Sequence, residues 1–276
     1  MRDRCIDQVT DHNVTQQNFA LEWNAERDML ITQPVPDDLS PYYVTDKYIS
    51  HQDEAQSLFQ KLYQSVKKIT IRQKGKLLSR KARKGALLDV GAGTGEFLQH
   101  MQQCGWEASG FEPGTDAHAK AKSKGLHLLD SLRSLPQDHF SAITLWHVLE
   151  HIPELDEHLA LFHHALQKDG LLLIAVPNFK SYDAKHYGRY WAAYDVPRHL
   201  WHFSEPAMQR LAQQHGYVFE GSQPMWFDSF YVSLLSEQYQ TGKMKFVKAF
   251  LIGLYSNLRA MKNSEYSSKI YFLRKK

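Results

Sequence analysis

Cysteine is nearly absent from the 276-residue sequence, because only Cys5 and Cys104 are present. This excludes a disulfide framework and favours a reducing compartment. Long hydrophobic runs are also missing. The apolar stretch 246–254 includes Lys248 and is far shorter than the roughly 20 residues that span a bilayer. Residues 1–10 are charged and lack the apolar segment of a secretion signal. We therefore expect a cytoplasmic protein without a transmembrane segment.

Acidic residues are scarce in two stretches of the chain. Residues 61–84 contain ten Lys and Arg and no Asp or Glu, and residues 243–276 contain nine against the single acid Glu265. Such basic stretches suit an anionic partner, or they are the solvated faces of amphipathic helices. No nucleic-acid-binding module is recognisable, so nucleic acid is not expected. A peripheral membrane contact and an anionic acceptor both stay open.

Residues 85–223 alternate short apolar runs with helical patterns. We expect buried strands at 87–90, 107–111, 126–129, 142–146 and 171–176, with helices between them. Repeated strand–helix units of this length predict an α/β fold with a parallel sheet covered on both faces. A helix over 206–215 with Ser204 as its N-cap, and further strands at 217–220 and 268–273, complete the pattern.

The flanking segments divide the chain into two expected domains. Residues 1–84 form an N-terminal extension, irregular over 1–53 and then an amphipathic basic helix over 54–80. Residues 85–276 form the main domain, with an aromatic- and His-rich insertion at 178–203 and a second insertion at 224–265. The second insertion has a helical pattern at Phe246, Phe250 and Leu254.

A glycine-rich turn follows the first strand of the main domain, in the sequence LLDVGAGTGE from Leu87 to Glu96. Such a turn between a buried strand and a helix brings backbone close to a ligand. A dinucleotide fingerprint would require glycine at position 96, so Glu96 argues against a dehydrogenase. Glu112 ends the second strand, where an acid is placed to chelate a ribose diol.

This D-x-G-x-G-x-G pattern with a strand-end acid resembles the class I S-adenosylmethionine-dependent methyltransferases, over roughly residues 85–223. The resemblance implies a Rossmann-like sheet of seven strands, mostly parallel with the last antiparallel. It also implies S-adenosylmethionine as the cofactor and S-adenosylhomocysteine as its product. The cofactor contacts that it implies are Asp89, Gly91, Ala92, Gly93, Gly95, Glu112, Asp130, Ser131, Trp146 and His147.

The first insertion contains the pattern W-x-x-x-D-x-P-R-H-L-x-H-F-S from Trp191 to Ser204, which resembles the methyltransferase-23 branch of that family. The resemblance implies that this segment forms a wall of the acceptor pocket. We expect acceptor contacts from Tyr190, Trp191, Tyr194, Arg198 and His199, although a structural pair is the favoured interpretation of Asp195 with Arg198. Because imidazole titrates near neutral pH, the expected catalytic residues are His147, His199 and His202.

Two metal hypotheses arise from the same resemblance. Members of this branch often begin with a cysteine-rich zinc ribbon before a run that matches Tyr42–His51. Because only Cys5 remains there, we expect no structural zinc, and a degenerate remnant that caps the cofactor cleft. Some relatives bind a metal through an E-x-x-E-H run, for which this chain has His147, Glu150 and His151. We assign no metal ligands and keep this triplet as the alternative.

The function expected from this resemblance is methyl transfer to a small-molecule or carrier- or lipid-linked acceptor. Oxygen is the favoured acceptor atom because histidines crowd the expected site, while nitrogen and carbon stay open. The alternative is a catalytically inactive methyltransferase fold that binds an anionic partner through the basic stretches.

Overall fold

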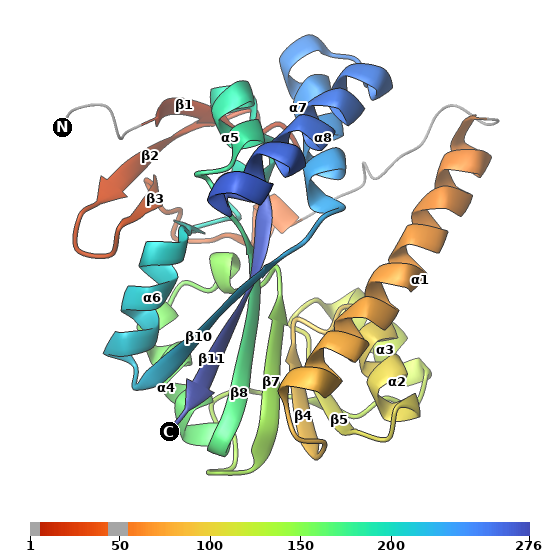
Figure 1. The fold of residues 1–276 in the computed structure, drawn as a ribbon, viewed down its shortest axis with the longest axis vertical. Helices are drawn as coiled ribbons and strands as arrows, with labels where there is room; N and C mark the ends of the chain where they lie inside the picture. Colours follow the sequence, from red (N-terminus) through yellow and green to blue (C-terminus); the bar gives the residue numbers. More distant parts are fainter. Residues whose placement is uncertain (1–5, 44–54) are drawn as a thin grey trace.

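A computed structural model describes residues 6–43 and 55–276 of the chain. It contains a seven-stranded sheet with helices on both faces and a smaller four-stranded sheet beside it (Figure 1). The strands of the large sheet are β4 (Ala86–Val90), β5 (Glu107–Phe111), β6 (Leu128–Leu129), β7 (Phe140–Trp146), β8 (Leu166–Pro177), β10 (Tyr217–Pro224) and β11 (Ser268–Lys275). The expected α/β fold is therefore confirmed.

The strand order of the large sheet is β10-β11-β8-β7-β4-β5-β6. Neighbouring strands from β8 to β6 pair in parallel, whereas β11 is antiparallel to both β8 and β10. The antiparallel last strand expected from the sequence is thus present. Because the parallel strands share one direction, the segments that follow β4, β5, β6, β7 and β8 meet at one edge of the sheet.

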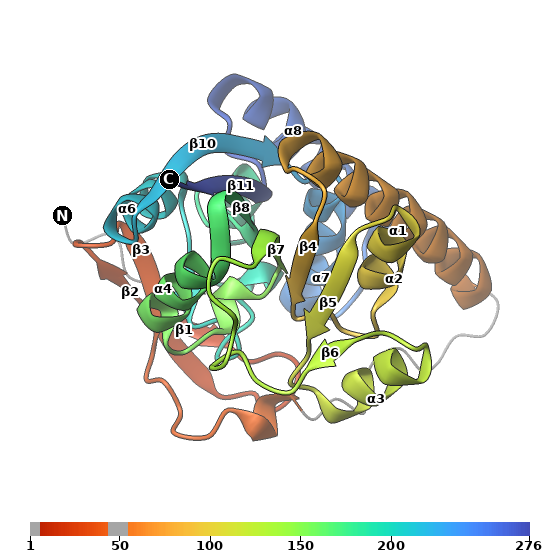
Figure 2. The same cartoon turned by 90° about the horizontal axis from the view of Figure 1, so that it is seen from below.

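Helices pack on the two faces of this sheet because its central strands are apolar on both sides. In β8, Leu171, Leu173 and Ala175 join one core cluster, whereas Leu172, Ile174 and Val176 join the other. The first cluster includes side chains of α1 (Ala55–Lys81), α2 (Glu96–Gln103) and α3 (Thr115–Ser123), and the second includes those of α4 (Leu155–Ala165) and α6 (Glu205–Gln214). Figure 2 shows the two sets of helices on either side of the strands.

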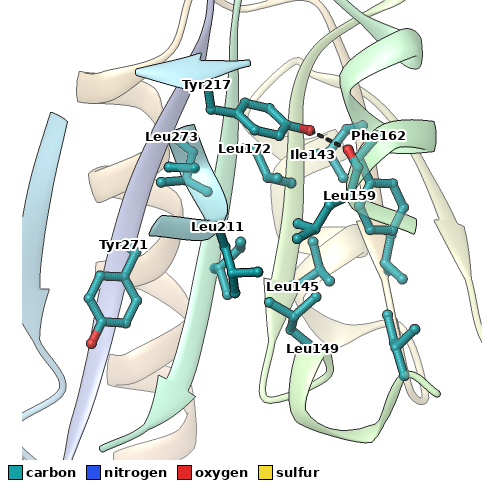
Figure 3. Packing of buried hydrophobic residues seen from close by; sticks show 14 of the residues in the cluster. Ile143, Leu145, Leu149, Leu159, Phe162, Leu172, Leu211, Tyr217, Tyr271 and Leu273 are labelled. Atoms are coloured by element: carbon teal, nitrogen blue, oxygen red, sulfur yellow. Dashed lines mark hydrogen bonds between the residues drawn. The ribbon is translucent and has the colours of Figure 1, made fainter. Parts of the chain in front are cut away.

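A side-chain hydrogen bond lies within the core cluster beneath α4 and α6 (Figure 3). Tyr217 lies among Leu211, Leu273 and Leu159, and its hydroxyl donates a 2.9 Å hydrogen bond to the carbonyl of Leu159. This satisfies the only polar atom of a side chain that is otherwise surrounded by apolar groups. At the start of α6, Ser204 accepts a hydrogen bond from the backbone of Ala207, which confirms the expected N-cap.

The four-stranded sheet corrects one expectation from the sequence. It consists of β1 (Ile6–Thr10), β2 (Asn18–Asn24), β3 (Met29–Gln33) and β9 (Trp201–His202), so the described part of 1–53 is not irregular. Alternating burial of Phe19 and Leu21 on β2 explains why this segment forms a strand. Because β9 belongs to the first insertion, the N-terminal extension and that insertion share one core. Cys5 and residues 44–51 of the Tyr42–His51 run lie outside the described residues.

The two insertions supply the remaining elements. The first contains α5 (Tyr182–Tyr187) and the single 3₁₀ turns η3 (Gly188–Tyr190) and η4 (Ala192–Tyr194), and the second forms the helix pair α7 (Asp228–Thr241) and α8 (Phe246–Asn263). Two further 3₁₀ turns are η1 (Ser40–Tyr43) and η2 (Leu149–His151).

The pattern at Phe246, Phe250 and Leu254 correctly predicts the helix α8, but these side chains are exposed. None of the helices in the described part of the chain is both long enough and apolar enough to cross a bilayer.

Candidate active site

The glycine loop after β4 is anchored to the end of β5 by backbone hydrogen bonds. The N–H groups of Gly91 and Ala92 both donate to the carbonyl of Phe111, at 2.8 and 3.0 Å. Gly91, Gly93 and Gly95 all have positive φ, a region that L side chains rarely adopt. A Cβ added at Gly91 or Gly95 would overlap a neighbouring side chain, whereas at Gly93 it would meet open space. Gly93 is therefore the point where the loop is accessible to a ligand.

Glu112 reaches the glycine loop from the end of β5. Its two carboxylate oxygens accept hydrogen bonds of 2.8 Å each, one from the N–H of Gly93 and one from the N–H of Gly114. The adjacent pairing of β4 and β5 explains this contact. Asp130 and Ser131, after β6, are both exposed, and Asp130 lies 3.7 Å from the ammonium of Lys122. The strand-end acid and the loop thus form one continuous site.

Asp89 lies deeper in the sheet, on β4. It is buried and accepts a 2.6 Å hydrogen bond from the hydroxyl of Thr144 on β7. Burial raises the pKa of Asp89 to about 7, which the hydrogen bond from Thr144 and the charge of Lys74 only partly oppose. Lys74 extends from α1 with its ammonium 4.3 Å from the ring centre of Trp146, and burial lowers the pKa of this lysine. The sequence pattern predicts a basic helix that includes Lys74, but nothing in it indicates this contact.

His147, at the end of β7, lies between two carboxylates. Its Nε2 is 3.0 Å from Oδ2 of Asp228 on α7, and its Nδ1 is 3.4 Å from Oε1 of Glu150. Burial lowers the pKa of His147, but the nearby carboxylates of Asp228 and Glu150 outweigh it and raise this pKa to about 9. His147 is therefore a cation at neutral pH. Asp228 lies in the second insertion, where no sequence motif pointed to it.

Glu150 is fully buried among three histidines, His147, His151 and His199. His199 contacts the carbonyl of Ala193 through Nδ1 at 2.9 Å, so this nitrogen carries the proton and Nε2 is left 4.0 Å from Glu150. Burial, together with the charge of His199, lowers the pKa of His151 to about 4, so this ring is neutral. His147 and His199 hold the pKa of Glu150 below its usual value against the opposing effect of burial.

Three of these groups also form a set of possible metal ligands. One atom each of Glu150, His151 and His199 lie within 4.8 Å of one another. Neither carboxylate oxygen of Glu150 has a hydrogen-bond partner among the described residues. Imidazole nitrogens and a carboxylate are ligands that a divalent transition metal accepts. This set contains His199 in place of His147 from the triplet that the sequence suggested.

The remaining residues that were expected to bind the acceptor or to act in catalysis differ in how deeply they are buried. Trp191 and Tyr194 are buried in the core under the small sheet, where the indole N–H of Trp191 donates a 2.8 Å hydrogen bond to Asp183. His202 is buried on β9 with Nε2 3.0 Å from the hydroxyl of Thr32, and burial lowers its pKa well below the usual value. These three side chains are therefore buried, with exposed fractions of 4% or less. Tyr190 is only partly buried.

Arg198 forms an ion pair with Asp195, as the favoured interpretation expected. The side chain of Asn13 also donates a 3.0 Å hydrogen bond to Asp195, which ties the N-terminal extension to the first insertion. The second oxygen of Asp195 lies 3.8 Å from Nε2 of His199. Asp195 thus connects the ion pair to the histidine cluster.

A separate cavity of about 390 Å³ lies at the amino ends of β4, β5 and β7. Ala86, Glu107 and Phe140, the first residues of these strands, line it. It is at the sheet edge opposite the glycine loop, and none of the residues of the candidate site borders it.

Comparison with known sequences agrees with this geometry. A family model described as a methyltransferase domain, Methyltransf_23, matches residues 61–220. An uncharacterized methyltransferase from Alkaliphilus oremlandii is 29% identical over 109 residues, which are 37% of this chain and 50% of the relative. The chain therefore matches about half the length of this curated relative.

Solved structures share the fold at low sequence identity. A SAM-dependent methyltransferase from Archaeoglobus fulgidus has a TM-score of 0.53 and 18% identity, covering 80% of this chain and 100% of that one. A possible histamine N-methyltransferase from Thermotoga maritima also has a TM-score of 0.53, with 14% identity over 80% of this chain and 100% of that one. A mycolic acid cyclopropane synthase complexed with SAH has a TM-score of 0.52 and 15% identity, covering 74% and 83%.

The family match extends over more than half of the chain and includes the glycine loop, Glu112 and the histidine cluster. The solved structures add that the sheet and its helices are arranged as in S-adenosylmethionine-dependent enzymes. The chain therefore belongs to the Methyltransf_23 family of methyltransferase domains and has the Rossmann-like fold of class I methyltransferases.

Proposed function

We propose that the protein transfers a methyl group from S-adenosylmethionine to a hydroxyl of a small or carrier- or lipid-linked acceptor, in the cytoplasm. The observation that supports donor binding is the contact between Glu112 and the N–H of Gly93, beside the open side of the loop. The Glu112 carboxylate would bind the ribose hydroxyls. Gly91–Gly95 would contact the methionine and ribose through backbone, and Asp130 and Ser131 would lie beside the adenine.

Charge favours this donor over a dinucleotide. Glu112, Glu150 and Asp228 lie at the edge of the sheet where the loop begins. Lys74 and His147 offset their negative charge only in part. Asp89, with a pKa of about 7, adds about half a negative charge at neutral pH. Such an acidic site attracts an ammonium and a sulfonium and repels a pyrophosphate. Trp146 and His147, at the end of β7, would line the methyl side of the donor.

The donor supplies a methyl group that is already activated, so the protein mainly aligns the acceptor and excludes water. His199 is the proposed base. Its Nε2 would accept the proton of the acceptor hydroxyl while the new carbon–oxygen bond forms and the carbon–sulfur bond breaks. Glu150 and Asp195 would orient this imidazole and stabilise its protonated form. His147, a cation at neutral pH, would position the acceptor instead of removing a proton.

The buried carboxylate of Glu150 favours metal binding as a second candidate role for the histidine cluster. Glu150, His151 and His199 would hold a divalent cation, which would supply positive charge to the acceptor oxygen. Metal analysis of the purified protein separates the two roles. About one equivalent of metal in wild type that is lost in His199→Asn would support the cation site. Wild type without bound metal would leave His199 as the base.

Transfer of an isotope-labelled methyl group tests the proposed function. The protein would be incubated with [methyl-¹³C]S-adenosylmethionine and either small-molecule or lipid extracts of bacterial cells. We expect a labelled product with a carbon shift typical of an O-methyl group, and a rate roughly 100-fold lower in His199→Asn. A labelled N-methyl or C-methyl product would overturn the acceptor atom. Donor binding without any labelled product would favour the inactive binding module.

A further inference from the structure

Helix α8 packs on the molecule through small residues. Ala249, Gly253, Ser256 and Ala260 are buried, and each follows the previous one by three or four positions. A Cβ added at Gly253 would lie 2.9–3.0 Å from atoms of Phe230, so this helix approaches α7 very closely. The inward face of α8 is therefore defined by small side chains, and its large apolar side chains point elsewhere.

The outward side of α8 is apolar along its whole length. We call it the α8 apolar face, which consists of Val247, Phe250, Leu251, Leu254, Tyr255, Leu258 and Met261. Their exposed fractions run from 37% at Leu254 to 76% at Val247. An ordinary surface helix buries this stripe and exposes its polar side. A contiguous exposed apolar patch of this kind marks a contact surface.

Only basic charges accompany this face. Residues 243–264 contain five Lys and Arg and no Asp or Glu. Lys243 and Lys245 lie at the N-terminal end of α8 and Lys262 in its last turn, and all three are exposed. Apolar side chains flanked by lysines are the pattern of a helix that lies in the plane of an anionic membrane. A symmetric contact between two copies of the chain would bring these positive charges together.

We propose that the α8 apolar face docks on an anionic membrane surface, with its apolar side chains among the lipid acyl chains and its lysines at the phosphate headgroups. Trp226 and Phe227, just before α7, are also exposed and would lie near the headgroup level. The contact is peripheral, because no helix in the described part of the chain could span the bilayer.

The position of the helix pair relates this surface to the active site. The α7–α8 pair connects β10 to β11, at the end of the sheet where β8 and β10 finish (Figure 1). The first residue of α7, Asp228, contacts His147. A protein docked through α8 would therefore hold its acceptor side near the bilayer. The inference that the acceptor is a membrane lipid or lipid-linked molecule rests on the proposed function, whereas membrane docking itself does not.

Vesicle co-sedimentation of the full chain tests the proposal, using phosphatidylcholine vesicles with or without phosphatidylglycerol. We expect binding that requires the anionic lipid and weakens as salt is added. Leu251→Glu with Leu258→Glu should lower the vesicle partition coefficient at least about tenfold. Lys243→Glu with Lys262→Glu should lower it about fivefold for each residue changed. Lys168→Glu is the matched control, at the start of β8 on the opposite end of the sheet, and should bind like wild type.

Two further measurements separate the possible failures. Because Leu251 and Leu258 are exposed, thermal unfolding and S-adenosylhomocysteine affinity should be unchanged in that double variant. Vesicle binding that is absent in wild type, or equal in wild type and the double variant, would overturn the proposal and leave donor binding untouched. Light scattering compares the oligomeric states of the two proteins. If wild type is a dimer and the double variant is a monomer, the α8 apolar face binds a second copy of the chain and the proposal is overturned.

Discussion

The glycine loop and the histidine cluster lie at the same edge of the sheet but are built in different ways. The loop is local: Gly91–Gly95 and Glu112 come from consecutive strands, and backbone N–H groups bind one carboxylate. The cluster is assembled from distant segments, because His147, His199 and Asp228 come from the end of β7, the first insertion and α7. The shape of the glycine loop therefore depends on its backbone, whereas the histidine cluster depends on buried charge.

The largest effect that this difference predicts is in the glycine loop. Gly95→Val should lower the free energy of unfolding by about 3 kcal/mol or more, because the new side chain would overlap Leu126 at a backbone φ of +82°. Urea unfolding measures the change.

Gly125→Val is the matched control for that substitution. Gly125 also has positive φ, but an added Cβ would meet nothing within 4 Å, so only backbone strain of about 1–2 kcal/mol is expected. Equal losses of stability in both variants would contradict the claim that close packing shapes the loop.

A smaller effect distinguishes Trp191, which is buried, from Tyr190, which is only partly buried. Trp191→Phe should lower the free energy of unfolding by about 1.5–3 kcal/mol, because it removes a hydrogen bond to the buried Asp183 carboxylate. Tyr190→Phe loses only an exposed contact with Arg189 and should be close to neutral. Denaturant titration measures both losses. A larger loss of stability in Tyr190→Phe than in Trp191→Phe would contradict the assignment of Trp191 to the core.

The smallest effect concerns the charge of His147. Its folded-state pKa of about 9 lies above the unfolded value, so its contribution to stability is complete below about pH 6.5 and is lost as the pH rises through 9. Asp228→Asn removes one of the two carboxylates that raise this pKa. We expect the imidazole titration followed by NMR to move toward neutral pH, and the loss of stability between pH 6.5 and 9 to shrink by about 1 kcal/mol. An unchanged titration would mean that Glu150 alone holds the charge.

The sequence predicted most of the large sheet because its strands are short, apolar and separated by clear turns. It also singled out Glu112 as an acid at the end of a strand, and the structure places this side chain against the glycine loop because both follow neighbouring parallel strands. The N-terminal sheet was missed because its partner β9 has only two residues and lies more than 160 positions away. Lys74 and Asp228 were missed for a related reason: each is an ordinary charged residue at a helix, and only tertiary packing brings it to the site.

Calorimetric titration with S-adenosylhomocysteine tests the central claim, that the glycine loop and Glu112 form the donor site. We expect wild type to bind and Glu112→Ala to bind roughly 10- to 100-fold more weakly, through loss of a charged hydrogen-bond acceptor. Glu107→Ala, at the exposed start of the same strand, should match wild type. Gly93→Arg should abolish binding by filling the open side of the loop. Equal affinity in all four proteins would contradict the account.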